Sequence, residues 1–381
     1  MSVENEIKQK KKISFTLPIK EDSRRLRWID QARGFIMLLL VITLVKPWEE
    51  ATLEGTFLFF LTRHPDEFAK YMTLFDIGVP AFMFILGLSF VISFNKRKSK
   101  KGTLNAILRV IIKGIIFLLL GYFMNLIEYG FDFGVLFEYS SEAGFKIPLW
   151  DVLHTLGLAT IVALPFIFIK EPKYRLVAAY IWMFLYQILS IFTSIHYYAM
   201  LTYNGGIFGT IFTLSGVIIV AASLGDYIFN TEHPPKKKYT NMAILGVINL
   251  IVGLLIGLMP GWEPSKRIST FSYGLISLGV IILSLLVFVY FDEKKNWNLG
   301  YLLAFGRQPF FTYFMAEILY QIPKELLDLT LTGRWILTGV IIAVTSVVNM
   351  IFYKKKKYVP TEIAVIYFAL IGILFAIATT L

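Results

Sequence analysis

The sequence contains no cysteine and only four histidines, and these shortages narrow the chemistry that the chain can perform. Without cysteine it can form no disulfide, thiolate metal site, iron–sulfur cluster or thiol nucleophile. Neither a GxGxxG loop nor a Walker loop occurs, which excludes phosphate cradles of these two types. We also expect no bound metal. Charged residues make up only 17% of the chain, against about 25% in soluble domains, which argues against a soluble globular protein.

Long apolar runs take the place of the missing charge. Hydrophobic residues make up 56% of the chain. A helix needs about 20 apolar residues to cross a bilayer core of about 30 Å. The sequence therefore predicts an all-α polytopic membrane protein with about eleven transmembrane helices. The expected spans are residues 29–46, 73–94, 104–125, 149–169, 175–194, 207–229, 241–259, 272–291, 299–322, 334–353 and 359–380.

Basic residues are concentrated in every second connection between these spans. By the positive-inside rule, this alternation predicts a cytoplasmic N-terminus and, for an odd number of spans, a C-terminus outside. It also accounts for the formal net charge of +11, so membrane lipids rather than nucleic acid are the expected partners. The pattern and the short outer loops fit a bacterial plasma membrane. The basic runs are Lys8–Lys12, Lys96–Lys101, Lys170–Arg175, Lys236–Lys238, Lys294–Lys295 and Lys354–Lys357.

Two pairs of ionisable residues flank the first two spans. Asp30 and Arg33 are three residues apart, on one helix face at the predicted cytoplasmic end of span one. They form either an ion pair that anchors the span or the polar floor of a substrate pocket. His64 lies in the first outer loop, and Asp76 begins span two. The histidine is either solvated or a general base, and Asp76 either orients it or is simply favoured at a helix N-terminus.

Two further pairs lie at opposite ends of spans three and four. Asp151 and His154 share a face at the outer end of span four. They form either a functional site within the membrane or a buried hydrogen-bonded pair. Arg109 and Lys113 share a face near the cytoplasmic end of span three. These cations either snorkel to the lipid headgroups or hold a polyphosphate that enters from the cytosol.

The later spans carry two polar irregularities. Residues 306–309, with the sequence Gly-Arg-Gln-Pro, are predicted to break span nine. Lys266 is a basic residue in an outer loop, and this departure from the charge rule marks a candidate site. Four polar residues of span nine are expected to face the interior of the protein, because lipid contact would be costly. They are Arg307, Gln308, Tyr313 and Glu317.

The order of several short motifs resembles one family of membrane enzymes. The motifs are Leu26–Gly34, His64, Asp76–Pro80, Phe84–Gly87, Val152–Gly157, Phe208–Ile211, Pro264–Tyr273 and Gly306–Gln308 with Glu317. Over residues 24–357 they are similar to the catalytic domain of heparan-α-glucosaminide N-acetyltransferase and of related bacterial membrane proteins. Leu44 departs from the pattern, since those enzymes have an asparagine there. The acyltransferase-3 group is the second choice, because its first span ends with a histidine that this chain lacks.

The resemblance implies a transmembrane acyltransferase. Such an enzyme takes acetyl-CoA from the cytosol and passes the acetyl group to an amino-sugar or glycan acceptor on the outer face. The implied active-site base or acyl carrier is His64, with Asp76 to orient it. For such an enzyme we expect Asp151, His154 and Lys266 in the acceptor pocket, Arg109, Lys113, Arg307 and Gln308 at the coenzyme, and Asp30, Arg33 and Glu317 as structural or pocket residues.

The resemblance also divides the chain into three parts. These are a basic cytoplasmic tail (1–27), a transmembrane acyltransferase-like domain of about ten helices (28–357) and an additional C-terminal transmembrane helix (358–381). Alternative functions stay open: a proton-coupled transporter or flippase of envelope precursors, an acyltransferase-3-like O-acyltransferase, and a membrane protein that has lost its activity. The sequence also leaves open which acceptor and which acyl length the enzyme uses. It does not decide whether transfer is direct or passes through an acyl-histidine, or whether the protein is a homodimer.

Overall fold

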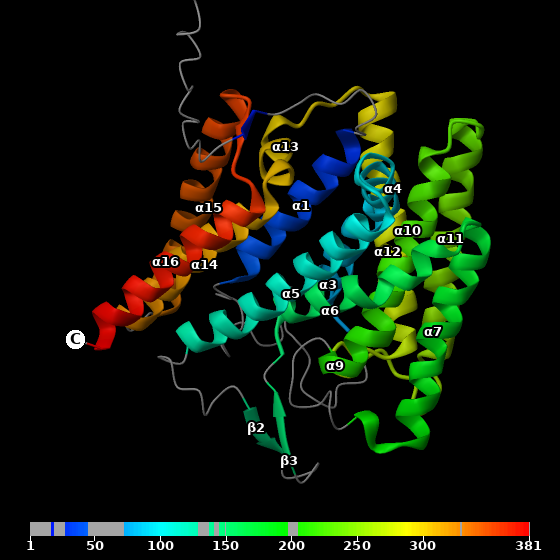
Figure 1. Cartoon of the computed structure of the whole chain (residues 1–381), viewed down its shortest axis with the longest axis horizontal. Coiled ribbons are helices and arrows are strands. Elements are labelled where there is room, and N and C mark those ends of the chain that lie inside the picture. The colour runs from blue at the N-terminus through cyan, green and yellow to red at the C-terminus, as the bar shows by residue number, and fades with distance from the viewer. Residues whose placement is uncertain are drawn as a thin grey trace, which may run out of the picture.

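The computed structural model shows a bundle of helices (Figure 1). It describes residues 17–18, 27–44, 72–128, 137–140, 145–148, 150–196, 205–327 and 330–380. The earlier helices are α1 (Arg27–Leu44), α3 (Gly78–Leu88), α4 (Phe90–Lys101), α5 (Thr103–Glu128), α6 (Val152–Ala163) and α7 (Pro172–Phe192). The later helices are α9 (Gly206–Gly209), α10 (Ser215–Phe229), α11 (Pro235–Ile256), α12 (Phe271–Val289), α13 (Gly300–Arg307), α14 (Pro309–Leu326), α15 (Leu331–Lys354) and α16 (Thr361–Thr380).

Short elements extend or connect these helices. Single turns of 3₁₀ or π helix are η2 (Phe75–Ile77), η4 (Leu164–Phe168), η5 (Ser194–His196), η7 (Thr210–Leu214) and η8 (Tyr290–Lys294). Two small antiparallel strand pairs join β1 (Leu17–Pro18) to β4 (Lys357–Tyr358) and β2 (Phe137–Ser140) to β3 (Phe145–Pro148).

Seven helical stretches in the described part of the chain are long and apolar enough to cross a membrane. They are Phe75–Lys101, Thr103–Leu126, Pro172–Phe192, Gly206–Phe229, Pro235–Ile256, Phe271–Lys294 and Leu331–Lys354. A shorter apolar stretch covers Val152–Phe168. Each predicted span overlaps a helix or a run of helices, which agrees with an all-α polytopic membrane fold. The count of eleven crossings and the sides of the two termini stay predictions.

The helices lie in two groups with a layer between them (Figure 1). Helices α13 to α16 gather with α1 on one side, and α7, α10, α11 and α12 gather on the other. Helices α3, α5 and α6 lie between these groups. The lysine-rich end of α4, the start of α11 and the end of α15 lie at one end of the bundle, which we call the basic end. Helix α9 and the β2–β3 hairpin lie at the opposite end.

The predicted break in span nine is confirmed. A single non-helical residue, Gln308 (φ −139°, ψ 59°), separates α13 from α14. The next residue is Pro309, which disfavours a helical conformation at the residue before it and has no N–H to donate. The Gln308 amide nitrogen donates to Asn349 Oδ1 at 2.7 Å, and its amide oxygen accepts from the Val359 N–H at 3.3 Å. This side chain thus ties the break to α15 and to the segment before α16.

Helix α1 crosses α13 at a contact that requires glycine. A Cβ atom on Gly306 would lie 1.9 Å from the Asp30 carbonyl oxygen, and one on Gly34 would lie 1.8 Å from that of Leu302. The two backbones therefore touch, as at the small-residue crossings of membrane helices. At this crossing Arg33 lies 3.2 Å from the Asp30 carboxylate and also donates to the Gly306 carbonyl at 3.4 Å. The structure thus contains the ion pair expected of these two residues, and the pair holds α1 against α13.

A second buried cation joins α7 to α10. Arg175 is 2% exposed, and its guanidinium lies 2.7 Å from the Asp226 carboxylate. Three further hydrogen bonds from the guanidinium go to backbone carbonyls, so the charge is both paired and hydrogen-bonded, as burial requires. These carbonyls belong to Phe166, Ile169 and Ala222.

Candidate functional site

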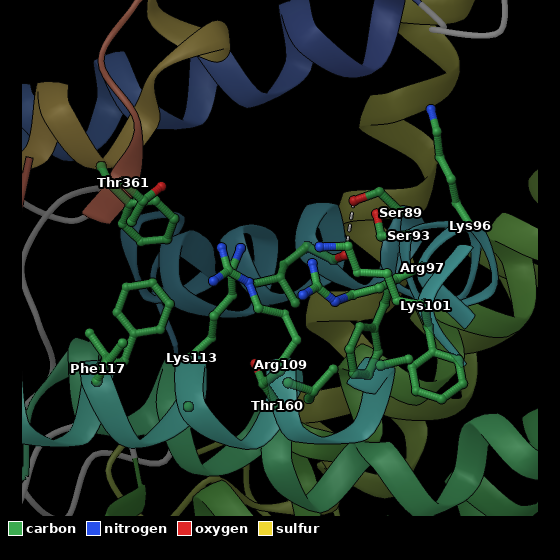
Figure 2. A pocket seen from close by; sticks show the side chains of 18 of the residues that line it. Ser89, Ser93, Lys96, Arg97, Lys101, Arg109, Lys113, Phe117, Thr160 and Thr361 are labelled. Atoms are coloured by element: carbon green, nitrogen blue, oxygen red, sulfur yellow. Dashed lines mark hydrogen bonds between the residues drawn. The ribbon is translucent and has the colours of Figure 1, made fainter. Parts of the chain in front are cut away.

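A pocket of about 540 Å³ lies between α4 and α5 near the basic end (Figure 2). Side chains from α6, α14 and α16 complete its walls. Six of the described lining residues are cations, and the described lining includes no acid. The cations are Lys96, Arg97, Lys100, Lys101, Arg109 and Lys113. We refer to this site as the basic pocket.

A tight turn brings the two cationic helices together. The connection between α4 and α5 is one residue, Gly102, whose φ of 86° suits glycine and few other residues. The turn folds the basic end of α4 back against the first turns of α5. A hydrogen bond of 3.0 Å from Arg97 Nε to Asn105 Oδ1 ties the two helices across it. The cations at the end of α4 and those on α5 therefore line the same pocket.

The α5 pair predicted from the sequence takes part in this pocket. Arg109 and Lys113 are four residues apart on one face of α5, and their side chains extend into the pocket (Figure 2). An arginine fork can bind phosphate oxygens in bidentate fashion, and lysine adds a point charge. Six cations around one cavity fit a ligand with several phosphate charges. The four α4 cations were interpreted from the sequence only as a topology signal.

The inner part of the basic pocket is apolar and aromatic. The rings of Phe117 and Phe310 lie 4.8 Å apart between centroids, and both line the pocket. Behind them the Phe82 ring meets Phe310 edge-on at 5.7 Å. These three rings come from α5, α14 and α3, and Phe117 is buried at 8% exposure. The pocket therefore has a charged mouth and an apolar floor.

A second charged group is buried at the opposite end, where η2 leads into α3. Asp76 has no exposed surface. One of its carboxylate oxygens accepts from the Thr73 N–H at 2.8 Å and from the Thr73 hydroxyl at 3.2 Å. The other lies 3.6 Å from Lys266 Nζ, whose side chain is 18% exposed. The Tyr273 hydroxyl donates to the Asp76 backbone carbonyl at 2.8 Å. Asp76 is therefore held from three directions.

The Lys266 contact accounts for the departure from the charge rule. This lysine departs from the charge rule in the sequence, and the structure pairs it with the buried carboxylate of Asp76 in η2. Its loop is fastened to α7, because Gln187 donates to the Gly261 carbonyl and accepts from the Phe271 N–H. Two residues predicted to serve separate roles, Asp76 in catalysis and Lys266 in acceptor binding, thus lie together. His64 lies outside the described residues.

Asp151 and His154 form a cap at the start of α6. The His154 Nδ1 atom accepts from the Asp151 N–H at 3.1 Å, and the Asp151 side chain caps the first turn. The imidazole is fully buried, stacks on Trp150 at 5.1 Å and meets the Tyr122 ring edge-on. This arrangement is the buried hydrogen-bonded pair that the sequence left open. It fixes the start of α6.

The predicted polar residues of span nine lie apart from the basic pocket. Arg307 rests over the Tyr353 ring at 4.8 Å, and Gln308 supports the helix break. Neither is among the described residues that line the basic pocket. Glu317 is buried on α14, as expected of a polar residue that faces inward. Sequence reasoning therefore located two of the described lining cations, and two of its four coenzyme candidates lie elsewhere.

Comparison with known proteins adds one finding. A family model described as an acyltransferase domain, of the acyltransferase-3 type, matches residues 26–354. The chain belongs to the acyltransferase-3 family. It is therefore a membrane acyltransferase by family, with the cation-lined cavity inside the matched region except for its α16 wall. A search of curated proteins found no match.

The family assignment changes the ranking made from the sequence. The acyltransferase-3 group was placed second because no histidine follows Arg33 in the first span, and the match shows that this absence does not exclude membership. The narrower resemblance to heparan-α-glucosaminide N-acetyltransferase is not confirmed and stays a prediction. The family supports an enzyme rather than the transporter or flippase that the sequence left open.

Proposed function

We propose that this acyltransferase-3 protein uses an acyl-CoA, in the simplest case acetyl-CoA, as its donor at the basic end. The observation that carries the proposal is the basic pocket, where six cations surround one cavity without an acidic lining residue among those described. A coenzyme A molecule carries several phosphate charges and an extended, mostly uncharged arm. The cationic mouth suits the phosphates, and the apolar floor at Phe117 and Phe310 suits the arm.

The donor and the acceptor are proposed to meet across the membrane. Leu86 of α3 lines the basic pocket, and Asp76 lies ten residues earlier in the same helical run. Ten residues of helix rise about 15 Å. An arm that enters past Phe117 and Phe310 therefore points along α3 toward the opposite end. The three-ring cluster must shift for the thioester to pass.

The chemistry is proposed for the opposite end, with His64 as general base or acyl carrier. In direct transfer, the acceptor hydroxyl or amine gives its proton to His64 as its oxygen or nitrogen bonds to the thioester carbonyl carbon. The carbon–sulfur bond breaks, and the CoA thiolate takes a proton to leave as the thiol. Asp76 would orient the base, and Lys266 would place a positive charge where the carbonyl oxygen becomes negative.

The acceptor is proposed to be a glycan of the cell envelope on the outer face of a bacterial plasma membrane. An O-acyl product fits the acyltransferase-3 family, and an amide on an amino sugar fits the narrower resemblance. Asp151 and His154 are proposed to shape this side through their cap on α6 rather than by contact with the acceptor. Arg307, Gln308, Asp30 and Arg33 are proposed to position helices.

The test separates donor binding from transfer. The detergent-purified protein is titrated with CoA and with acetyl-CoA, and an Arg109→Gln/Lys113→Gln variant is compared with a Lys236→Gln/Lys237→Gln control. Both pairs remove two charges at the basic end, but only the first lines the basic pocket. Two charge-assisted hydrogen bonds are worth roughly 3 kcal/mol, so the first variant should bind CoA about 100-fold more weakly.

The control should bind like the wild type. A wild type that CoA does not stabilise, or a pocket variant with unchanged affinity, would refute the proposal. His64→Ala should abolish transfer of labelled acetyl while CoA binding stays intact, and full activity in that variant would remove His64 from the mechanism.

A further inference from the structure

The wall of the basic pocket includes an element that lies beyond the family match. The match ends at residue 354, and α16 begins at Thr361. Two α16 residues, Thr361 and Val365, line the pocket. They are four residues apart, so they occupy one face of the helix. Figure 2 shows Thr361 across the pocket from Phe117, at the side where Lys113 extends from α5.

Helix α16 is packed into the bundle along the same side. Ala364 and Phe368 are 3% and 4% exposed, and the Phe368 ring stacks on Phe314 of α14 at 4.7 Å. Its start is fixed as well, because the Val359 N–H donates to the Gln308 side chain that supports the α13–α14 break. The same break sets the first turn of α14, which carries the Phe310 ring into the pocket floor. The floor and the α16 wall therefore share one support.

We propose that α16 is part of the donor-binding site of this protein. The Thr361 hydroxyl donates a hydrogen bond to an anionic phosphate oxygen of the donor, and Val365 packs against its uncharged arm. The identity of the donor rests on the proposed function; the binding role of α16 needs only a phosphorylated ligand in the basic pocket. The face of α16 that is turned away from the pocket carries Ile366, which is 58% exposed.

The adjacent positions 365 and 366 give a matched pair of variants. Val365→Trp places an indole in the pocket, whereas Ile366→Trp places the same group on the exposed face. Val365→Trp should weaken CoA binding at least about 100-fold, because the indole occupies space that the ligand needs. Ile366→Trp should bind within about twofold of the wild type. Thermal unfolding of both variants without ligand shows that each is folded.

A second pair tests the hydroxyl. Thr361→Val keeps the shape of the side chain but removes the donor, and it should weaken CoA binding about tenfold, as expected for one hydrogen bond to a charged group. Thr361→Ser should restore most of the affinity. Unchanged CoA affinity in both Val365→Trp and Thr361→Val, with the wild type binding CoA, would overturn the role of α16 alone.

Inorganic pyrophosphate separates this proposal from the proposed function. If the wild type binds pyrophosphate but not CoA, the acyl-CoA function fails. Weaker pyrophosphate binding in Thr361→Val would then still support α16 as part of an anion site, and unchanged binding would refute it. If the wild type binds neither ligand, both proposals fail.

Discussion

The ion pair between Asp76 and Lys266 allows a quantitative test of how the opposite end is built. At 3.6 Å and an effective dielectric constant of about 20, two unit charges attract by ~5 kcal/mol. Lys266 is 18% exposed, so solvent screens the pair, and desolvation of the fully buried Asp76 offsets part of the attraction. We expect a net coupling of about 2 kcal/mol in the free energy of unfolding.

The perturbation is a double-mutant cycle of Asp76→Asn, Lys266→Met and the combined variant. Lys266→Met removes the cation that faces a fully buried carboxylate, so it should destabilise the protein by about 2–3 kcal/mol. Asp76→Asn removes the negative charge that faces Lys266, and the 18% exposure of that lysine allows water to replace part of the contact. The combined variant should be less destabilised than the sum of the two single variants by about 2 kcal/mol.

The assay is equilibrium unfolding in mixed micelles of dodecylmaltoside and sodium dodecyl sulfate. Lys295→Met removes an exposed charge and serves as the control, with an expected change within about 0.5 kcal/mol. If the two single variants add to within about 0.5 kcal/mol, the ion pair does not stabilise the fold, and the argument from burial and distance is wrong.

Two further variants test the helix crossings. Gly306→Ala should prevent stable folding, because the added Cβ would lie 1.9 Å from the Asp30 carbonyl oxygen. The control Gly339→Ala, whose added Cβ has nothing within 4 Å, should change stability by less than about 1 kcal/mol. Equal yields of the two folded variants after detergent extraction would contradict this prediction. Arg175→Leu should lower the free energy of unfolding by about 3 kcal/mol or more, since it removes the buried donor that serves the Asp226 carboxylate and three backbone carbonyls. If the variant unfolds at the same midpoint as the wild type, water replaces the guanidinium and the prediction is wrong.

Local patterns in the sequence predicted much of the fold. Apolar windows located the helices, because membrane-spanning segments must satisfy their own backbone hydrogen bonds and must be apolar. Pro309 predicted the break between α13 and α14, since proline restricts the residue before it. The i, i+3 spacing of Asp30 and Arg33 predicted a contact that helix geometry alone produces.

The contacts between distant elements could not be predicted in the same way. Lys266 was recognised as unusual, but its partner Asp76 is 190 residues earlier in the chain, and only the packing of the bundle brings the two together. The cations at Lys96–Lys101 looked like a topology signal, because their part in the pocket depends on the turn at Gly102. Arg307 and Gln308 were assigned to the coenzyme because the sequence does not show which side of a broken helix faces a cavity.

The turn at Gly102 has a consequence for how the basic pocket can evolve and be studied. Helices α4 and α5 form one hairpin, and the six cations that line the pocket all lie on it. The same charges lie where two apolar stretches meet, Phe75–Lys101 and Thr103–Leu126, and basic residues beside such stretches favour the cytoplasmic side during insertion. Ligand affinity and membrane orientation thus depend on shared residues. Loss of these cations in evolution would therefore weaken both ligand binding and the signal for membrane orientation. Any variant that removes one of these charges must be checked for its orientation in the membrane before its activity is interpreted.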